Sequence, residues 1–331
     1  MSRLSEHLRF SGFAITLIVL VVGFALVVDR FATVANLASL AHTAAPLMII
    51  AAGLTFLMIA GRIDISVGST AFVATVVGAR FMSEWNLNPL LGVALIVAVG
   101  ALVGAVNGTL VTRLDLDPLV VTLGMMIALR GVALSAMGGT VVRLPEAFSV
   151  MSRAKIGPVF LDSLLALLIL VVGQLILVRT APGRQLVGIG DDREVARSFG
   201  FPVRSRTFQA FVACSALAAF GGVVSASQLG AVNTTFGAGM EFLGIAAVVL
   251  GGTSLFGGRG SFFPGAVIGV GILVVIQNGL TLLAASPYAY PIVRGLVIFV
   301  AMYADALRST RQDKRKPKAA APPPRELQPT A

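Results

Sequence analysis

Long apolar runs separated by short polar segments dominate the hydropathy pattern of this 331-residue chain. Each run holds about 17–25 residues, the length that a helix needs to cross about 30 Å of hydrocarbon. We therefore predict an all-α polytopic membrane protein with about ten transmembrane helices. The predicted spans are 13–28, 42–60, 66–82, 89–112, 118–138, 159–178, 207–227, 241–256, 262–283 and 288–307.

The composition supports this class, because 56% of the residues are hydrophobic, 12% are charged and the mean hydropathy is +0.92. Such a chain has too few polar side chains to cover a soluble globule. An even number of spans puts both termini on one side. Placing them in the cytosol keeps most of the 25 lysine and arginine residues inside, so the net charge of +10 reflects the inner membrane face and not nucleic acid binding.

The chain divides into a cytosolic N-terminus at 1–12, a transmembrane domain at 13–307 and a basic, Pro-rich cytosolic tail at 308–331. The composition of the tail predicts disorder, and its charge suits a topology anchor. We expect the first span to stay as an anchor, since no small-residue cleavage pattern follows it. Cys214 is the sole cysteine and lies in a predicted span, so no disulfide can form within the chain.

One long charged segment, residues 179–206, interrupts the apolar spans and is predicted to carry a short amphipathic helix. Asp191 can accept the free amides of the first turn, and Glu194 three positions later forms a capping-box-like pair with it. Gly200 is placed to end the helix.

The helix has an apolar side formed by Val195, Ala196 and Phe199 and a basic side formed by Arg193 and Arg197. This pattern favours a docking element for another protein. The alternative is a helix that lies flat on lipid headgroups, as basic amphipathic segments do.

The sequence contains no recognisable active site. None of the four lysines follows a glycine, so there is no phosphate-binding G-x-x-x-x-G-K-[ST] loop, and any ATP hydrolysis must take place on another subunit. His7 and His42 lack metal-ligand spacing, and neither H-E-x-x-H nor G-x-S-x-G occurs. We therefore predict no catalytic residues, no cofactor and no metal site.

The two halves of the bundle resemble each other weakly. The stretch leading to Asn107 and the following Arg130 resembles the stretch leading to Asn278 and the following Arg294. Five spans separate the copies, so they would have opposite orientations, as in the inverted repeats of transporters. The glycines at 100, 104 and 108 indicate close helix packing, and enrichment of glycine in packed helices is the alternative explanation of the similarity.

Three polar residues inside predicted spans are candidates for a translocation path: Asn107, Arg130 and Asn278. Arg130 would lie near the middle of the bilayer, where a cation faces either the bundle interior or water. It could line the path or clamp backbone carbonyls. The two amides could meet solute hydroxyls or make interhelical hydrogen bonds. Asp64 is expected to cap the helix that begins near Ser66.

Several strings then point to a family. They are GRIDISVGS at 61–69, the Asn107-Gly108 pair, Thr122 to Gly124 with Arg130-Gly131, residues 190–200, and AAVVLGGTSLFGGRGS at 246–261. Together they resemble the ribose-type permeases of bacterial ABC importers, within the wider branched-chain amino acid and sugar permease superfamily. The resemblance runs from about 46 to 305.

The resemblance implies a permease subunit in the bacterial inner membrane that pairs with a second copy or a paralogue. A tandem-type ATPase would dock inside, and a periplasmic sugar-binding protein would deliver its solute outside. Segment 179–206 then resembles the family's G-x-N-x-x-A-A-R-x-S-G pattern, with Asp192, Val195 and Phe199 departing from it. The implied coupling residues are Gly190, Asp191, Glu194, Val195, Ala196, Arg197, Phe199 and Gly200.

Two alternatives stay open at this point. The solute could be a branched-chain amino acid or a nucleoside, because the binding protein makes most of the selection in such importers. An ion-coupled secondary transporter is the other class, and inverted repeats occur there too. Such proteins often bury acids along an ion path, whereas only Asp162, near a span end, is a candidate here.

Overall fold

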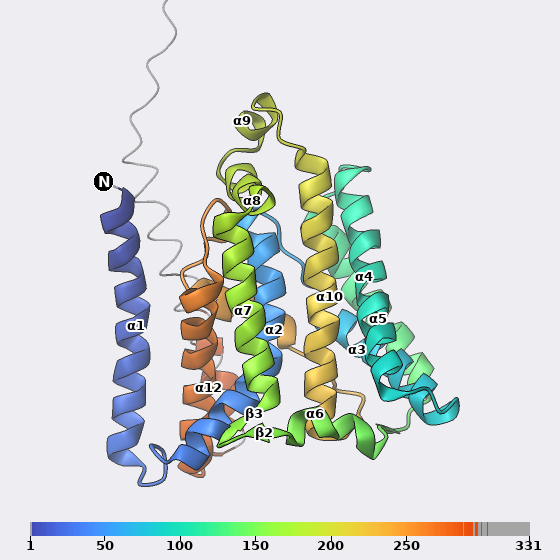
Figure 1. Ribbon diagram of the computed structural model, residues 1–331, viewed down its shortest axis with the longest axis vertical. Coiled ribbons are helices and arrows are strands. Elements are labelled where there is room, and N and C mark those ends of the chain that lie inside the picture. Colours follow the sequence, from blue (N-terminus) through green and yellow to red (C-terminus); the bar gives the residue numbers. More distant parts are fainter. Residues whose placement is uncertain (1, 287, 294, 297–298, 300–302, 304–331) are drawn as a thin grey trace, which may run out of the picture.

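The computed structural model describes residues 2–286, 288–293, 295–296, 299 and 303 as a bundle of long helices (Figure 1). The α-helices are α1 Ser2–Val27, α2 Val34–Ile59, α3 Val67–Glu84, α4 Pro89–Thr112, α5 Pro118–Met137, α6 Val150–Arg153, α7 Leu161–Arg179, α8 Ala181–Asp191, α9 Arg193–Ser198, α10 Val203–Leu229, α11 Met240–Leu250 and α12 Val267–Leu282. A 3-10 turn at Glu146–Ser149 and a π turn at Phe262–Ala266 complete the helical elements.

Six of the described helices are long and apolar enough to cross a membrane: Val34–Ile59, Pro89–Thr112, Pro118–Met137, Leu161–Arg179, Val203–Leu229 and Phe262–Leu282. Gly12–Val27 and Met240–Leu250 are shorter apolar helices. The predicted all-α class is confirmed, but the count of about ten spans is not. The whole predicted tail 308–331, Arg294 and much of the predicted span 288–307 lie outside the described residues.

The predicted span 241–256 is wrong in its length, because α11 ends at Leu250. Gly252 follows with φ +86°, a left-handed conformation that glycine adopts without steric cost. Eleven residues rise only about 16 Å, roughly half of the hydrocarbon thickness. α11 is therefore too short to cross a bilayer by itself.

The central packing contact joins α4 to α10 through the glycines that the sequence singled out. A Cβ at Gly104 would lie 2.6 Å from the Phe211 carbonyl oxygen, and one at Gly100 would lie 2.7 Å from that of Ser215. A Cβ at Gly108 would lie 3.0 Å from a ring carbon of Phe208 and 3.4 Å from the Cα of that residue. The prediction that these glycines let helix backbones approach closely is confirmed.

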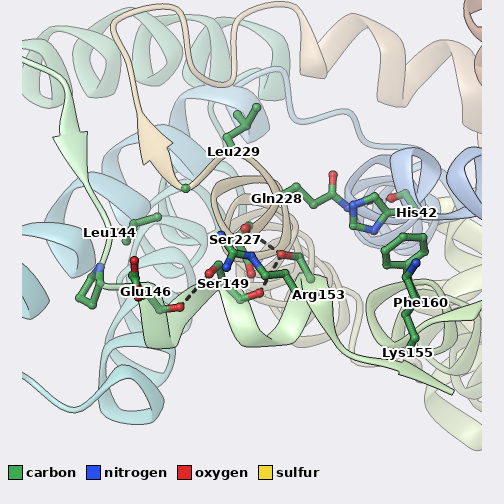
Figure 2. A pocket seen from close by; sticks show the side chains of 13 residues that line it. His42, Leu144, Glu146, Ser149, Arg153, Lys155, Phe160, Ser227, Gln228 and Leu229 are labelled. Atoms are coloured by element: carbon green, nitrogen blue, oxygen red, sulfur yellow. Dashed lines mark hydrogen bonds between the residues drawn. The ribbon is translucent and has the colours of Figure 1, made fainter.

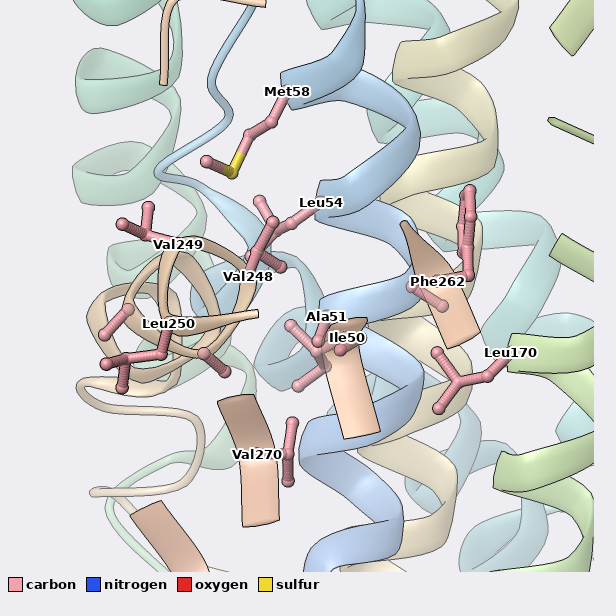
Figure 3. Packing of buried hydrophobic residues seen from close by; sticks show 14 of the residues in the cluster. Ile50, Ala51, Leu54, Met58, Leu170, Val248, Val249, Leu250, Phe262 and Val270 are labelled. Atoms are coloured by element: carbon pink, nitrogen blue, oxygen red, sulfur yellow. The ribbon is translucent and has the colours of Figure 1, made fainter. Parts of the chain in front are cut away.

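α2 runs through the middle of a dry apolar core. Ile50 and Leu54 of α2 lie between Val248 of α11 on one side and Leu170 and Phe262 on the other (Figure 3), and all five are buried. Lipid tails are as apolar as these side chains, so close packing rather than hydrophobic transfer stabilises the contact in a membrane.

The two ends of the bundle carry different elements. α8 and α9 lie at the end where α1 begins, whereas α6 and the short strands lie at the opposite end (Figure 1). Strand β1 (Val142–Arg143) pairs antiparallel with β4 (Ala231–Val232), and β2 (Lys155–Ile156) pairs antiparallel with β3 (Val159–Phe160). We refer to these as the α8–α9 end and the strand end.

Candidate functional site

Segment 179–206 forms two short helices instead of the single helix that the sequence predicted. Asp191 is the last residue of α8, and Asp192 caps α9 by accepting hydrogen bonds from the amides of Glu194 (2.9 Å) and Val195 (3.0 Å). The prediction that Asp191 is the cap is therefore wrong by one residue. Asp192 replaces the Asn of the family pattern, and both residue types cap a helix well.

The end of α9 follows the prediction for Gly200. This glycine has φ +77°, its amide donates to the Arg197 carbonyl at 3.0 Å, and the Phe201 amide donates to the Ala196 carbonyl at 3.0 Å. The two bonds form a Schellman motif, which closes a helix with a left-handed residue.

Only part of the apolar side of α9 is exposed in the folded protein. Ala196 is only 3% exposed and packs with Ile189, Phe201 and Val203, so it is not available to a docking protein as the predicted apolar side of the helix implied. Val195 is 48% exposed and Phe199 is 75% exposed. Ala196 therefore anchors α9 to the bundle, and Val195 and Phe199 form the free apolar surface.

Gly190 joins this pair of helices to the bundle. A Cβ at Gly190 would overlap the carbonyl oxygen of Ile59, the last residue of α2, and Ile59 also accepts the Gly258 amide at 2.9 Å. A Cβ at Gly257 would lie 2.8 Å from the Cα of Gly61. The strings 61–69, 190–200 and 246–261 thus meet backbone to backbone at a glycine junction.

Beside the junction, a groove of about 560 Å³ follows the corner between α9 and α10 and is lined by Asp115, Arg197, Phe201, Pro202, Val203, Arg204 and Ser205. Arg204 forms an exposed ion pair with Asp115 at 3.8 Å. In the α2–α3 loop, burial lowers the pKa of Arg62 from its ordinary value, and the charge of Arg193 lowers it further. The surface around α9 is therefore both apolar and basic.

Asn107 of α4 belongs to a buried polar cluster. Its Nδ2 donates to Ser66 Oγ at 3.0 Å and, at 3.5 Å, to Asp64, while Ser215 of α10 donates to Asp64 at 3.3 Å. Asp64 also accepts the Ser66 amide at 2.8 Å, but Ser66 is the N-cap of α3 and no described side chain accepts from its first-turn amides, so the prediction that Asp64 caps this helix is wrong. These contacts make Asn107 an interhelical hydrogen-bonding residue.

Asn278 has a comparable structural partner. Its amide pairs reciprocally with that of Asn36, at 3.0 Å in each direction, and joins α12 to α2. Asn36 Nδ2 also donates to the Phe31 carbonyl at 2.8 Å. A role of Asn278 in a translocation path stays a prediction.

Arg130 is partly buried and contacts a backbone carbonyl, which is one of the two roles considered for it. Its Nη2 donates to the Thr234 carbonyl at 3.5 Å, and its guanidinium lies 5.4 Å from the Phe72 ring centroid. An electrostatic interaction links it to Glu241, which is 7% exposed and whose Oε2 has no hydrogen-bond partner among the described residues. The sequence analysis missed Glu241 because it placed this residue at a span boundary.

Three carboxylates are buried in the described part of the bundle: Asp64 and Asp162 at 0% exposure and Glu241 at 7%. Asp64 and Glu241 lie in or beside the first turns of α3 and α11, which the search for acids in the middle of spans passed over. The scarcity of buried acids therefore does not separate an importer subunit from an ion-coupled transporter.

The strand end carries a second candidate site, an outer cleft of about 500 Å³ (Figure 2). Ser227 and Gln228 of α10, His42 of α2 and the segment 144–160 meet there (Figure 2). Its lining is His42, Leu144, Pro145, Glu146, Ser149, Ser152, Arg153, Lys155, Phe160, Ser227, Gln228, Leu229 and Gly230. We call this set of residues the outer cleft, after the side of the membrane on which the predicted topology puts it.

The sequence analysis did not identify this cleft. His42 and Gln228 lie at or next to the ends of different predicted spans, as does Asp162 beneath them, and the predicted topology puts these three ends on one side of the membrane. Polar residues at neighbouring span ends were the available signal. Which helices are neighbours is a tertiary property, so sequence alone did not join them.

Known proteins similar to this chain are membrane permeases. A family model described as the permease component of branched-chain amino acid transport systems matches residues 36–302. A probable ABC transporter permease of Sinorhizobium fredii is 34% identical over 302 residues, covering 90% of this chain and 89% of that protein. The Escherichia coli ribose import permease is 32% identical over 300 residues, covering 88% and 92%.

The autoinducer 2 import system permease of Klebsiella pneumoniae is 36% identical over 261 residues, covering 78% of this chain and 75% of that protein. No solved structure matches the chain significantly. The family match spans the strings at 61–69, 190–200 and 246–261, so it includes the glycine junction. The chain is therefore a multi-pass membrane protein that belongs to the branched-chain amino acid transport permease family.

Proposed function

We propose that this chain is the transmembrane subunit of a bacterial ABC importer for a sugar. The single observation that carries the proposal is the α8–α9 pair, which presents Val195 and Phe199 beyond the bundle and is joined to it through Gly190. Relatives named as ribose and autoinducer 2 import permeases support an importer of this kind.

The proposed orientation puts the α8–α9 end and both termini in the cytosol and the strand end outside. The distribution of lysine and arginine supports this orientation. A cysteine at Ser198 would then react with an impermeant thiol reagent only from the inside, and one at exposed Ala147 only from the outside. Cys214 is buried, so the native thiol would contribute little background.

Three partners follow from the proposal. A second permease copy or a paralogue completes the membrane part, a tandem-type ATPase binds α9, and a periplasmic binding protein docks at the strand end. Gly190 joins the short helices to the bundle, Asp191 ends α8 and Glu194 lies in the first turn of α9, whereas Val195, Arg197 and Phe199 contact the ATPase. Ala196 and Gly200 fix the position and the end of α9.

Energy transfer would pass through the glycine junction. Closure of the ATPase displaces α9, and the tight contacts of Gly190 with Ile59 and of Gly258 with Ile59 pass the displacement to α2. Packed glycine contacts resist compression, so a shift at one side moves the other. Asn107, Arg130 and Asn278 remain proposed residues of the path that α2 and its neighbours open.

A reconstituted importer provides the test. The permease, the ATPase and the binding protein are placed in liposomes, and uptake of labelled D-ribose is measured with ATP inside. A second candidate, a branched-chain amino acid, is favoured by the description of the family model, and L-leucine tests it in parallel. Uptake of leucine without uptake of any sugar would replace the proposed solute, and ATP hydrolysis by the isolated permease would contradict the proposed division of labour.

A further inference from the structure

Asp162 lies beneath the lining of the outer cleft and contacts two side chains of that lining. His42 Nδ1 and Gln228 Nε2 each lie 2.8 Å from the same carboxylate oxygen of Asp162. Gln228 Nε2 also donates to the His42 carbonyl at 2.7 Å. Figure 2 shows His42 and Gln228 side by side at the edge of the cleft.

An aromatic contact fixes the imidazole further. The rings of His42 and Phe160 are stacked with centroids 4.1 Å apart, and Lys155 Nζ lies 4.2 Å from the Phe160 centroid. His42 Nε2 and Gln228 Oε1 make no hydrogen bond to any residue that the structure describes. Buried groups that hold cleft-lining side chains in one orientation are the arrangement expected of a preorganised binding site.

The lining combines groups that hydroxyls recognise. Gln228 Oε1 accepts hydrogen bonds, Arg153 and Lys155 donate them, and the serine hydroxyls do both. Charges of both signs on the rim produce no single-sign field, which suits a neutral solute better than an anion. The volume of about 500 Å³ lies within the usual range of about 300–1,000 Å³ for small-molecule sites.

We propose that the outer cleft binds a neutral polyhydroxylated solute of monosaccharide size, with His42 Nε2 and Gln228 Oε1 as its oriented contacts. The inference rests on the proposed function, since it names where the imported sugar is first held by the permease. The cleft is assembled from α2, α10 and the segment 144–160, and Asp162 of α7 sits beneath it, so relative movement of these helices changes the site.

Cysteine protection on the full permease tests the site directly. Glu146→Cys introduces an exposed thiol on the rim and leaves the Asp162 network intact, while the native Cys214 is buried. We expect saturating D-ribose, D-xylose or D-glucose to slow modification by an impermeant thiol reagent at least about threefold, as a mostly occupied site would. Arg30→Cys, exposed at the same end outside the cleft, should react at an unchanged rate.

Two variants on the Glu146→Cys background separate binding from helix packing. His42→Phe keeps an aromatic ring against Phe160 and removes both ring nitrogens, and Gln228→Leu removes the amide. Each should raise the sugar concentration needed for protection about tenfold, the effect of one lost hydrogen bond. Thermal unfolding and ATPase binding show which variants keep the fold, and the variant that keeps it carries the comparison.

Each outcome bears on the proposal. Protection by a sugar that every folded variant weakens supports it. Protection by L-leucine alone, or sugar protection that a folded variant does not weaken, overturns it. If the reconstituted importer takes up a sugar that never protects Glu146→Cys, the cleft assignment fails while the proposed function stands. If no sugar protects and none is taken up, both fail.

Discussion

The two ends of the bundle differ in the kind of surface that they expose and in how the chain forms it. At the α8–α9 end, Phe199 is 75% exposed on a helix that is specified locally, by the Asp192 cap and the Gly200 stop. At the strand end, the outer cleft gathers polar side chains from distant parts of the chain around the buried Asp162. An exposed apolar surface suits a protein partner, whereas a polar cleft can hold a small solute.

The largest expected effect comes from substitutions in the exposed apolar surface of α9. Phe199→Glu, alone or with Val195→Glu, should abolish ATPase binding and sugar uptake, because each well-buried side chain supplies roughly 1.5–3 kcal/mol and a desolvated carboxylate has no partner. Retention of the ATPase on the purified permease is the measurement. Ile156→Glu, an equally drastic change of a residue that is 64% exposed at the strand end, should leave retention unchanged. If Phe199→Glu binds the ATPase and transports normally, α9 is a headgroup-lying segment.

A change at the glycine junction should affect stability and coupling together. Gly190→Ala forces a methyl group into the Ile59 carbonyl, and overpacking of this kind costs about 1–3 kcal/mol. We expect a lower unfolding temperature in detergent and reduced sugar-stimulated ATP hydrolysis. Gly23→Ala is the matched control, because nothing lies within 4 Å of a Cβ there. Equal stability of the two variants would show that the junction is looser than described.

Asp162→Asn should weaken sugar binding in the outer cleft and leave ATPase binding at α9 unchanged. Both contacts use one carboxylate oxygen, which Asn retains only as a neutral acceptor, and hydrogen bonds to a charged group contribute about 1.5–3 kcal/mol against about 0.5–1.5 kcal/mol for neutral pairs. Sugar protection of the cleft should weaken while ATPase binding stays the same. Asp29→Asn, an exposed acid outside the cleft, serves as the control. Loss of ATPase binding in Asp162→Asn would mean that the two ends are not independent.

The smallest predicted effect concerns the cap of α9. Asp192→Ala should weaken ATPase binding by about 1 kcal/mol, roughly fivefold, whereas Asp192→Asn should be close to neutral because Asn caps equally well. Titration of the ATPase against each variant gives the two affinities. A large loss in Asp192→Asn would show that the carboxylate charge itself contacts the partner.

Local sequence signals determined much of this protein. The apolar runs predicted the positions of α4, α5 and α10 closely, and the Gly200 stop and the glycine face of α4 followed from backbone geometry that depends on few neighbours. The cap of α9 was placed one residue early because Asp191 and Asp192 are equally good caps by type. Only the end of α8 decides between them.

The tertiary structure decided what the chain does with its polar residues. Asn107 and Asn278 were candidates for a path by residue type, and the fold gives them hydrogen bonds to Asp64 and Asn36 that the sequence did not identify. Ala196 belongs to the apolar side of α9 by periodicity, yet packing against Ile189 buries it. Periodicity reports which side of a helix a residue occupies. Exposure and hydrogen bonding depend on which other helix packs against that side, and this second helix comes from a distant part of the chain.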